Sequence, residues 1–211
     1  MTEAEIKRRL SRVYAAFGDK SEFKPEDFEP TVEELEGGGF IISQDFTGGR
    51  SQENLYIDAA SIINEIMGIR DRAKAWLTGN GRDSKKVDAF VKSELAVALV
   101  HDLANTDKHG KLDAPPFSGY MPSLAQVHRA TTLKYDPATG TYASSGTFTG
   151  PAFDALTGKT LSTGSSSDVE TVLASDIQDE YGNKVGELQK VLPDAIYKWE
   201  QFLVSNGLVL T

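Results

Sequence analysis

The sequence contains no cysteine, and this absence excludes several kinds of site. Disulfide bonds, thiolate metal ligands and thiol nucleophiles all need a cysteine side chain. Long apolar runs are also missing: the longest, residues 95–100, is far shorter than the roughly 20 residues of a membrane span. The first residues show no basic region followed by an apolar run, so no secretory signal is expected. We therefore predict a soluble, cytoplasmic protein that does not bind membranes.

Positive charge is in deficit. The 22 lysines and arginines are outnumbered by 31 aspartates and glutamates, which gives a formal net charge of −9. An acidic surface repels phosphate backbones, so the charge disfavours extended binding to nucleic acid. The hydrophobic fraction is 39%, which is enough for a folded core, and we predict that residues 1–211 form a single domain.

Apolar residues recur at helical spacing in several parts of the chain. Thr2 and Glu5 have the spacing of a capping box at the start of the first helix, and Ser51 is a cap candidate for the second. Because only a short turn separates the second and third helices, we expect them to pack as an antiparallel pair within residues 51–110. Leu95, Ala98 and Leu99 are expected on the buried face of the third helix. The predicted helices span residues 3–17, 53–77, 84–109 and 186–204.

Strand-like segments lie mostly between the third and fourth helices, in residues 111–185. Asp136 to Gly140 has the residues of a hairpin turn, with aspartate first, proline next and glycine last. The predicted strands are residues 40–42, 127–135, 141–148 and 169–177, and a short turn of helix is expected near residues 32–35. The fold class is therefore α+β: a bundle of three to four helices, with a small antiparallel sheet inserted before the C-terminal helix of residues 186–211. Residues 1–50 form the N-terminal helix and loop.

Polar residues gather at the end of the predicted 84–109 helix. His101, Asp102, Asn105, Lys108 and His109 follow one another at spacings that place them on neighbouring positions of one helix face. In the structural interpretation, Lys108 and His109 complement the negative end of the helix dipole. Asp102 and Asn105 would then hold residues 111–125 by hydrogen bonds, because buried polar groups need partners.

A metal site is an alternative interpretation of this cluster. His101, Asp102, Asn105 and His109 could supply nitrogen and oxygen ligands, with His101 and His109 as the histidine pair. Their spacing does not match the His-Glu-x-x-His pattern of zinc enzymes, and no third histidine lies nearby in sequence. The main prediction therefore contains no metal and no cofactor.

The pattern Asp-x-x-Asn-x-x-Lys-His, formed by Asp102, Asn105, Lys108 and His109, resembles a helix end of bacterial proteins related to the HEPN bundle (higher-eukaryote and prokaryote nucleotide-binding). The closing segment of residues 199–203, Trp-Glu-Gln-Phe-Leu, adds to the resemblance. It implies a role in RNA cleavage, or in prokaryotic defence and toxin systems, usually as a dimer that joins two polar helix faces. Active members carry an arginine a few residues before the catalytic histidine, whereas no arginine precedes His109 at that spacing.

Three functions follow as hypotheses, and the sequence does not decide whether the protein is an enzyme. The first is a HEPN-like interaction or defence-associated protein that acts by association, as a homodimer or with a protein partner. The second is an enzyme that uses His109 and Lys108, helped by Asn105 and Asp102, on RNA or a nucleotide. The third is a plain interaction module whose sheet presents Tyr135, Tyr142 and Phe148 to a protein partner.

Overall fold

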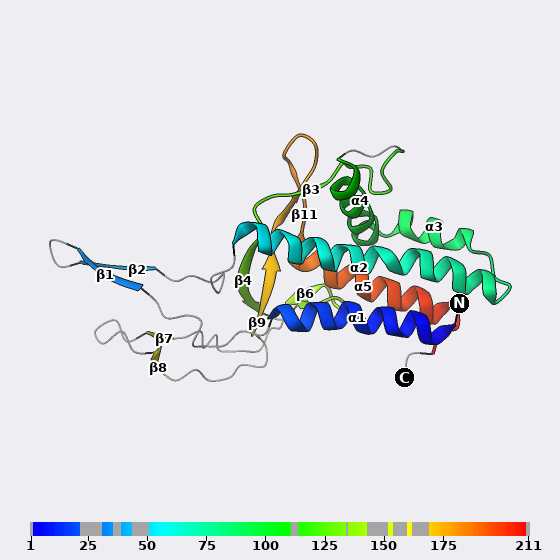
Figure 1. Cartoon of the computed structure of the whole chain (residues 1–211), viewed down its shortest axis with the longest axis horizontal. Coiled ribbons are helices and arrows are strands. Elements are labelled where there is room, and N and C mark those ends of the chain that lie inside the picture. Colours follow the sequence, from blue (N-terminus) through cyan, green and yellow to red (C-terminus); the bar gives the residue numbers. More distant parts are fainter. Residues whose placement is uncertain are drawn as a thin grey trace.

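The computed structural model describes residues 2–21, 31–35, 39–43, 51–110, 114–133, 135–142, 152–153, 160–161 and 169–209. Within these ranges the chain forms a helical bundle with antiparallel strands beside it (Figure 1). The helices are α1 (Glu3–Ser21), α2 (Gln52–Gly79), α3 (Lys85–Ser93), α4 (Leu95–His109) and α5 (Leu188–Ser205). The strands are β1 (Thr31–Leu35), β2 (Gly39–Ser43), β3 (Ser123–Leu124), β4 (His128–Leu133), β5 (Tyr135–Asp136), β6 (Thr141–Tyr142), β7 (Ala152–Phe153), β8 (Thr160–Leu161), β9 (Val169–Ala174), β10 (Asp176–Gln178) and β11 (Lys184–Glu187).

The first two helices begin as their caps predict. The amide of Thr2 donates to the Glu5 carboxylate at 2.8 Å, which is the return bond of a capping box. Ser51 accepts from the amide of Asn54 at 3.2 Å and starts α2. The predicted end of the first helix at residue 17, before Gly18, is wrong, because α1 continues to Ser21. A single glycine costs a helix only about 1 kcal/mol, which neighbouring turns can offset.

The predicted continuous helix of residues 84–109 is wrong. Glu94 adopts an extended conformation, with φ −110° and ψ 103°, and divides the segment into α3 and α4. Helix α3 returns antiparallel to α2, as expected, whereas α4 turns away and is seen nearly end-on in Figure 1. The break also changes the face that each residue presents: Leu95, expected in the core, is 52% exposed. From Val97 to Val100 every residue is buried, so α4 enters the interior directly after the break.

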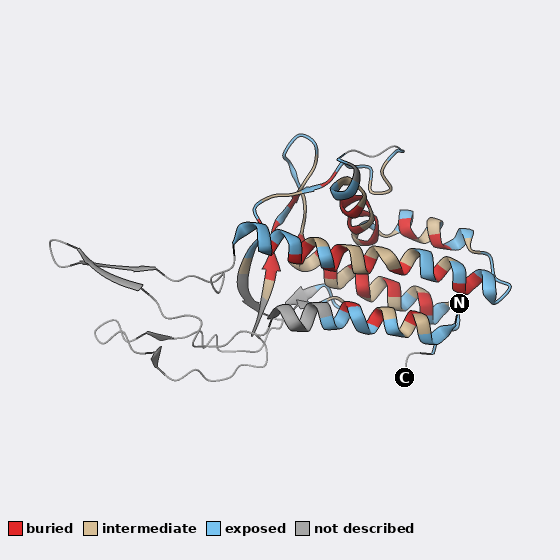
Figure 2. Cartoon of the chain, in the orientation of Figure 1, coloured by how far each residue is buried: buried red, intermediate tan, exposed pale blue. Residues whose placement is uncertain are grey.

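The core lies where α2, α4 and α5 meet, and α1 packs against α2 and adds its buried residues to the same core (Figure 2). Trp199 of α5 packs edge-on against Phe90 of α3, with 4.9 Å between ring centroids, and Phe90 stacks on Phe202 at 4.4 Å. These rings join α3 to the C-terminal helix. The last helix packs against α4 and α2 and so completes the predicted bundle, although Pro193 lies inside it.

An arginine of α1, Arg9, joins this helix to the backbone of α2. Arg9 donates to the carbonyl oxygens of Asn64 and Glu65 at 3.0 and 2.9 Å, and it pairs with the Glu65 carboxylate at 2.8 Å. Gly68 leaves the space for this guanidinium, because a Cβ atom at residue 68 would overlap it. Burial lowers the pKa of Arg9 slightly against the opposing effect of Glu65, and the group remains a cation.

The strands form several small antiparallel sheets instead of the single sheet predicted. Strands β4 and β9 pair from His128 opposite Ala174 to Leu133 opposite Val169, and β10 lies between β11 and β3. The predicted strand of residues 169–177 is interrupted at Ser175. The strand of residues 127–135 is described as β4 and the start of β5, and residue 134 between them lies outside the described residues. The predicted start of the last helix at residue 186 is wrong, because β11 continues to Glu187.

Two further strand predictions have different outcomes. The strand of residues 40–42 is confirmed as β2, but the helical turn near residues 32–35 is wrong, because these residues form β1 and pair with β2. The predicted strand of residues 141–148 is described only as β6, and its remainder, including Phe148, lies outside the described residues. The hairpin turn is confirmed: Asp136 accepts from the amide of Ala138 at 2.9 Å, and Gly140 has φ 67°.

The α+β fold class is therefore confirmed, with helices in a bundle and antiparallel strands before the C-terminal helix. Among the helices of the described ranges, none has both the length and the apolar composition of a membrane span.

Candidate functional site

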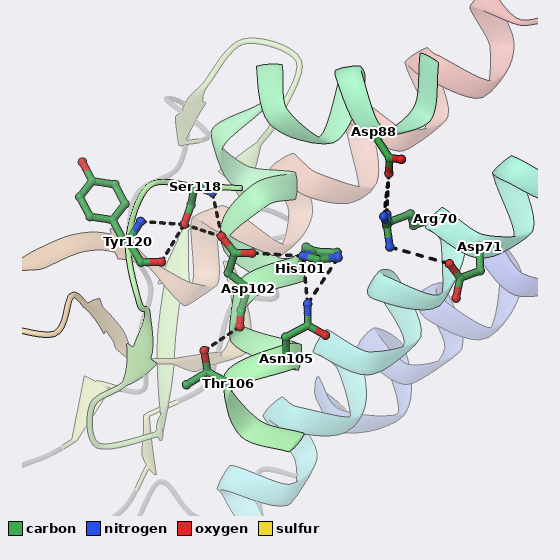
Figure 3. A network of polar contacts seen from close by, with 9 residues as sticks. All are labelled: Arg70, Asp71, Asp88, His101, Asp102, Asn105, Thr106, Ser118 and Tyr120. Carbon is green, nitrogen blue, oxygen red and sulfur yellow. Dashed lines mark hydrogen bonds and ion pairs between the residues drawn. The ribbon is translucent and has the colours of Figure 1, made fainter. Parts of the chain in front are cut away.

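Asp102 is the centre of the polar cluster on α4. Its side chain is 2% exposed, and one carboxylate oxygen accepts hydrogen bonds from both the amide and the hydroxyl of Ser118, each at 2.7 Å. The other oxygen lies 3.1 Å from Nδ1 of His101 (Figure 3). The structural interpretation, in which Asp102 holds the segment after α4, is confirmed by the bonds to Ser118.

The carboxylate of Asp102 is held in its ionised form. Burial raises the pKa of Asp102, but the hydrogen bonds from His101 and from the amide and hydroxyl of Ser118 outweigh burial, and the pKa lies below its usual value. A buried anion with several donors resembles an N-cap in its chemistry: it satisfies backbone and hydroxyl groups that would otherwise lack partners. This arrangement fixes residues 117–118 against α4.

The segment that Asp102 holds, residues 114–121, is also ordered by its own contacts. The hydroxyl of Ser118 lies 3.3 Å from both the carbonyl oxygen and the amide of Tyr120. Its neighbour Phe117 lies 4.6 Å from the ring of His101, measured between centroids. We call residues 114–121 the Asp102-anchored loop.

Phe117 also packs between two cations. The guanidinium carbon of Arg70 is 5.5 Å from the Phe117 ring centroid, and the ammonium of Lys92 is 5.6 Å from it. Arg70 is itself held by Asp88, to which it donates two hydrogen bonds at 3.0 and 2.7 Å. The ring therefore covers His101 and connects the Asp102-anchored loop to α2 and α3.

His101 has the orientation of a histidine paired with a carboxylate. Donation from Nδ1–H to Asp102 places the remaining lone pair on Nε2. The amide nitrogen of Asn105 lies 3.2 and 3.4 Å from the two ring nitrogens. The imidazole is 12% exposed because Phe117 lies against it. The ring is thus oriented by Asp102 and Asn105, and little of it reaches solvent.

The structure brings together some of the predicted site residues. Asp102 and Asn105 meet at His101, and the hydrogen bond of Asn105 is to the helix itself; within the described part of the predicted segment, residues 114–125, Asp102 supplies the bonds. Lys108 is exposed in the last turn of α4. His109 ends the helix, and its side chain lies outside the described residues. Gly110 closes the helix with φ 69°, as predicted.

No metal site emerges where the structure is described. Within those ranges, no three or more histidine, cysteine, aspartate or glutamate side chains are grouped so that they could hold an ion. The alternative metal pair cannot be placed as a pair, because it includes the side chain of His109. His101, its other member, faces Asp102 and Asn105.

Sequence reasoning missed Phe117 and Ser118, which complete the site. Their only signal was the Pro-Pro-Phe-Ser-Gly composition of residues 115–119, which is equally typical of a surface turn. Comparison of the chain with known proteins finds no matching family model, no matching curated protein and no matching solved structure.

Proposed function

We propose that this chain is a HEPN-like interaction protein of the cytoplasm, which binds a protein partner and does not cleave RNA. The observation that carries the proposal is the state of Asp102. Its carboxylate is 2% exposed and both of its oxygens contact groups of the same chain. A catalytic carboxylate has to reach substrate or orient a base that reaches it. Asp102 is enclosed and anchors a loop, and the imidazole that it orients is only 12% exposed because Phe117 lies against it.

The composition of the helix end supports the same conclusion. Lys108 is an exposed cation beside His109, but no arginine lies a few residues before that histidine. Phosphoryl transfer requires cations that stabilise the developing negative charge. One lysine, on a chain with net charge −9, supplies little positive charge to stabilise a phosphoryl-transfer transition state. Association of two helical surfaces needs none of these groups, and a homodimer is one form that the association can take.

A ribonuclease assay tests the proposal. Purified protein is incubated with a fluorophore-quencher RNA that contains single-stranded and hairpin regions, beside the variants His109→Ala and Lys108→Ala. Lys85→Ala, which removes an exposed lysine of α3, is the matched control. We expect all four proteins to leave the RNA intact. Cleavage by the unmodified protein that His109→Ala abolishes and Lys85→Ala retains would contradict the proposal.

Sedimentation velocity at micromolar concentration tests the form of association. A concentration-dependent shift from one protomer to two would support a homodimer. A monomer at every concentration would remove the homodimer and leave a different protein as the partner.

A second candidate function is an enzyme that acts on RNA or a nucleotide. The contact between His101 and Asp102 favours it, because a carboxylate that fixes an imidazole is a common arrangement of general bases. This candidate predicts that the same assay shows cleavage, and that His101→Ala or His109→Ala removes it while the melting temperature is retained. If the parent protein does not cleave RNA and His101→Ala lowers the melting temperature, the role of His101 is to hold the loop.

A further inference from the structure

Large apolar side chains are exposed at the end of the Asp102-anchored loop and in the neighbouring turn between β10 and β11. Tyr181 is 81% exposed, and Tyr120 and Met121 are each 37% exposed. Tyr181 lies in the turn between β10 and β11, and the other two lie at the end of the loop. The two segments are neighbours, because the amide of Met121 donates to the carboxylate of Glu180 at 3.3 Å and β3 pairs with β10. We call Tyr120, Met121 and Tyr181 the tyrosine patch.

The backbone under the tyrosine patch is well fixed. On one side, Ser118 is held by Asp102, and its hydroxyl contacts the backbone of Tyr120. On the other side, Asp179 accepts hydrogen bonds from the amides of Tyr181 and Asn183 at 2.9 and 2.8 Å. Exposed aromatic residues on an ordered backbone can bind a partner without a large loss of conformational entropy.

The surroundings of the patch are acidic. Residues 114–127 contain no charged side chain, so the local charge comes from the β10–β11 segment, residues 176–187. That segment has four acidic residues and one basic residue, Lys184, which pairs with Asp176 and Glu187 at 2.8 Å each. Lys190 also pairs with Glu187 at 2.8 Å, so the negative charge nearest to the patch is that of Asp179 and Glu180, which directly precede Tyr181. Glu180, beside Tyr181, is exposed. The surroundings of the patch are therefore negative, like the chain as a whole.

We propose that the tyrosine patch is a docking surface for a basic segment of a partner protein, with an arginine or lysine of the partner against the tyrosine rings and near Glu180. The rings attract a cation through their electron-rich faces, and the carboxylate adds charge complementarity. Nucleic acid does not fit, because the same carboxylates repel phosphate. This inference rests on the proposed function and names the surface and the partner chemistry that it requires.

Fluorescence anisotropy with a fluorescein-labelled hexa-arginine peptide tests the inference, with hexa-glutamate as the opposite-charge probe. Tyr181→Ala and Tyr120→Ala leave the net charge unchanged, so they separate the patch from general attraction to an acidic protein. Ile57→Ala, which truncates a 56% exposed side chain of α2, is the matched control. We expect hexa-arginine to bind and hexa-glutamate not to bind. Each tyrosine variant should weaken binding about three- to tenfold.

The conservative variant Tyr181→Phe keeps the ring and should keep most of the affinity, while Glu180→Gln should weaken binding mainly at low salt. Equal affinity of the unmodified protein, Tyr181→Ala and Tyr120→Ala for hexa-arginine would overturn the docking surface, and so would an absence of binding. Either result, in a protein that leaves RNA intact, overturns this inference alone. RNA cleavage that depends on His109 overturns the proposed function, whatever the peptide does.

Discussion

Replacing Asp102 by asparagine keeps the shape of the side chain but removes its charge. One of the two oxygens becomes an NH₂ group, which donates and cannot accept. In the folded protein that side chain faces donors: the amide and hydroxyl of Ser118 on one side and Nδ1 of His101 on the other. Either one donor loses its acceptor, or His101 changes tautomer so that Nδ1 accepts from the new NH₂ group. In both cases the remaining bonds lose their charge assistance.

The expected loss is large for one substitution. A hydrogen bond to a charged group contributes about 1.5–3 kcal/mol, and an unsatisfied buried donor costs about 1–3 kcal/mol. For Asp102→Asn we expect the free energy of unfolding to fall by about 2–4 kcal/mol. In a domain of this size that corresponds to a melting temperature lower by roughly 4–16 °C.

Urea unfolding followed by circular dichroism measures the change. Asp107→Asn is the matched control: it removes the same charge from the same helix, but Asp107 is exposed and accepts one hydrogen bond, from Tyr56 at 2.9 Å. The control should lose less than about 1 kcal/mol. A double-mutant cycle of Asp102→Asn with Ser118→Ala should show coupling above about 0.5 kcal/mol. Equal losses for Asp102→Asn and Asp107→Asn, or strict additivity with Ser118→Ala, would refute the reasoning.

The same pair of proteins gives a pH test with a definite sign. The pKa of Asp102 is lowered in the folded chain, so the unfolded chain takes up the proton first as the pH falls. The stabilisation is complete above the unfolded pKa of about 3.9 and is lost as the pH falls through the folded pKa. The difference in unfolding free energy between the parent and Asp102→Asn should therefore not shrink from neutral pH to about pH 4 and should shrink below it. A difference that shrinks already near pH 6 would contradict this assignment.

Three further substitutions test the packing. Gly68→Ala should destabilise the parent by about 1–2 kcal/mol, because the new methyl group displaces Arg9 from its hydrogen bonds to the α2 backbone. In an Arg9→Ala background, Gly68→Ala should be neutral or stabilising by up to about 1 kcal/mol. If Gly68→Ala destabilises that background as well, the account is contradicted. Gly110→Ala should cost about 1–2 kcal/mol at its φ of 69°, with Gly110→Asn costing less, as measured by urea unfolding. Trp199→Ala should cost about 3–5 kcal/mol and should loosen α3 through Phe90, which proteolysis within α3 would report.

Much of the helical framework is predictable from the sequence, because helix formation follows local spacing. The apolar residues of α2 recur at the helical period over its whole length, and Ser51 supplies the cap, so the predicted limits of residues 53–77 are close to the observed Gln52–Gly79. The same periodicity conceals the break at Glu94. Both α3 and α4 are helical, and one extended residue between them leaves the local pattern almost unchanged.

The candidate site is only half predictable, for a related reason. Neighbours on a helix, such as His101 and Asn105, follow from their spacing in the sequence. The bond from Ser118 to Asp102 joins residues 16 positions apart through a loop without periodicity, so no local rule selects Ser118 over other polar residues of the loop. The burial of Asp102 therefore depends on tertiary contacts that the local pattern does not contain.

Amide hydrogen exchange at Ser118 is the most direct test of the loop anchor on which the proposed function depends. The amide donates to the buried carboxylate at 2.7 Å, so it should exchange slowly in the parent protein. In Asp102→Asn its exchange should accelerate far more than that of core amides of α5, such as Ile196, relative to the parent. If the Ser118 amide exchanges at the same rate in the parent and in Asp102→Asn, while the core amides are equally protected in both, the account is contradicted.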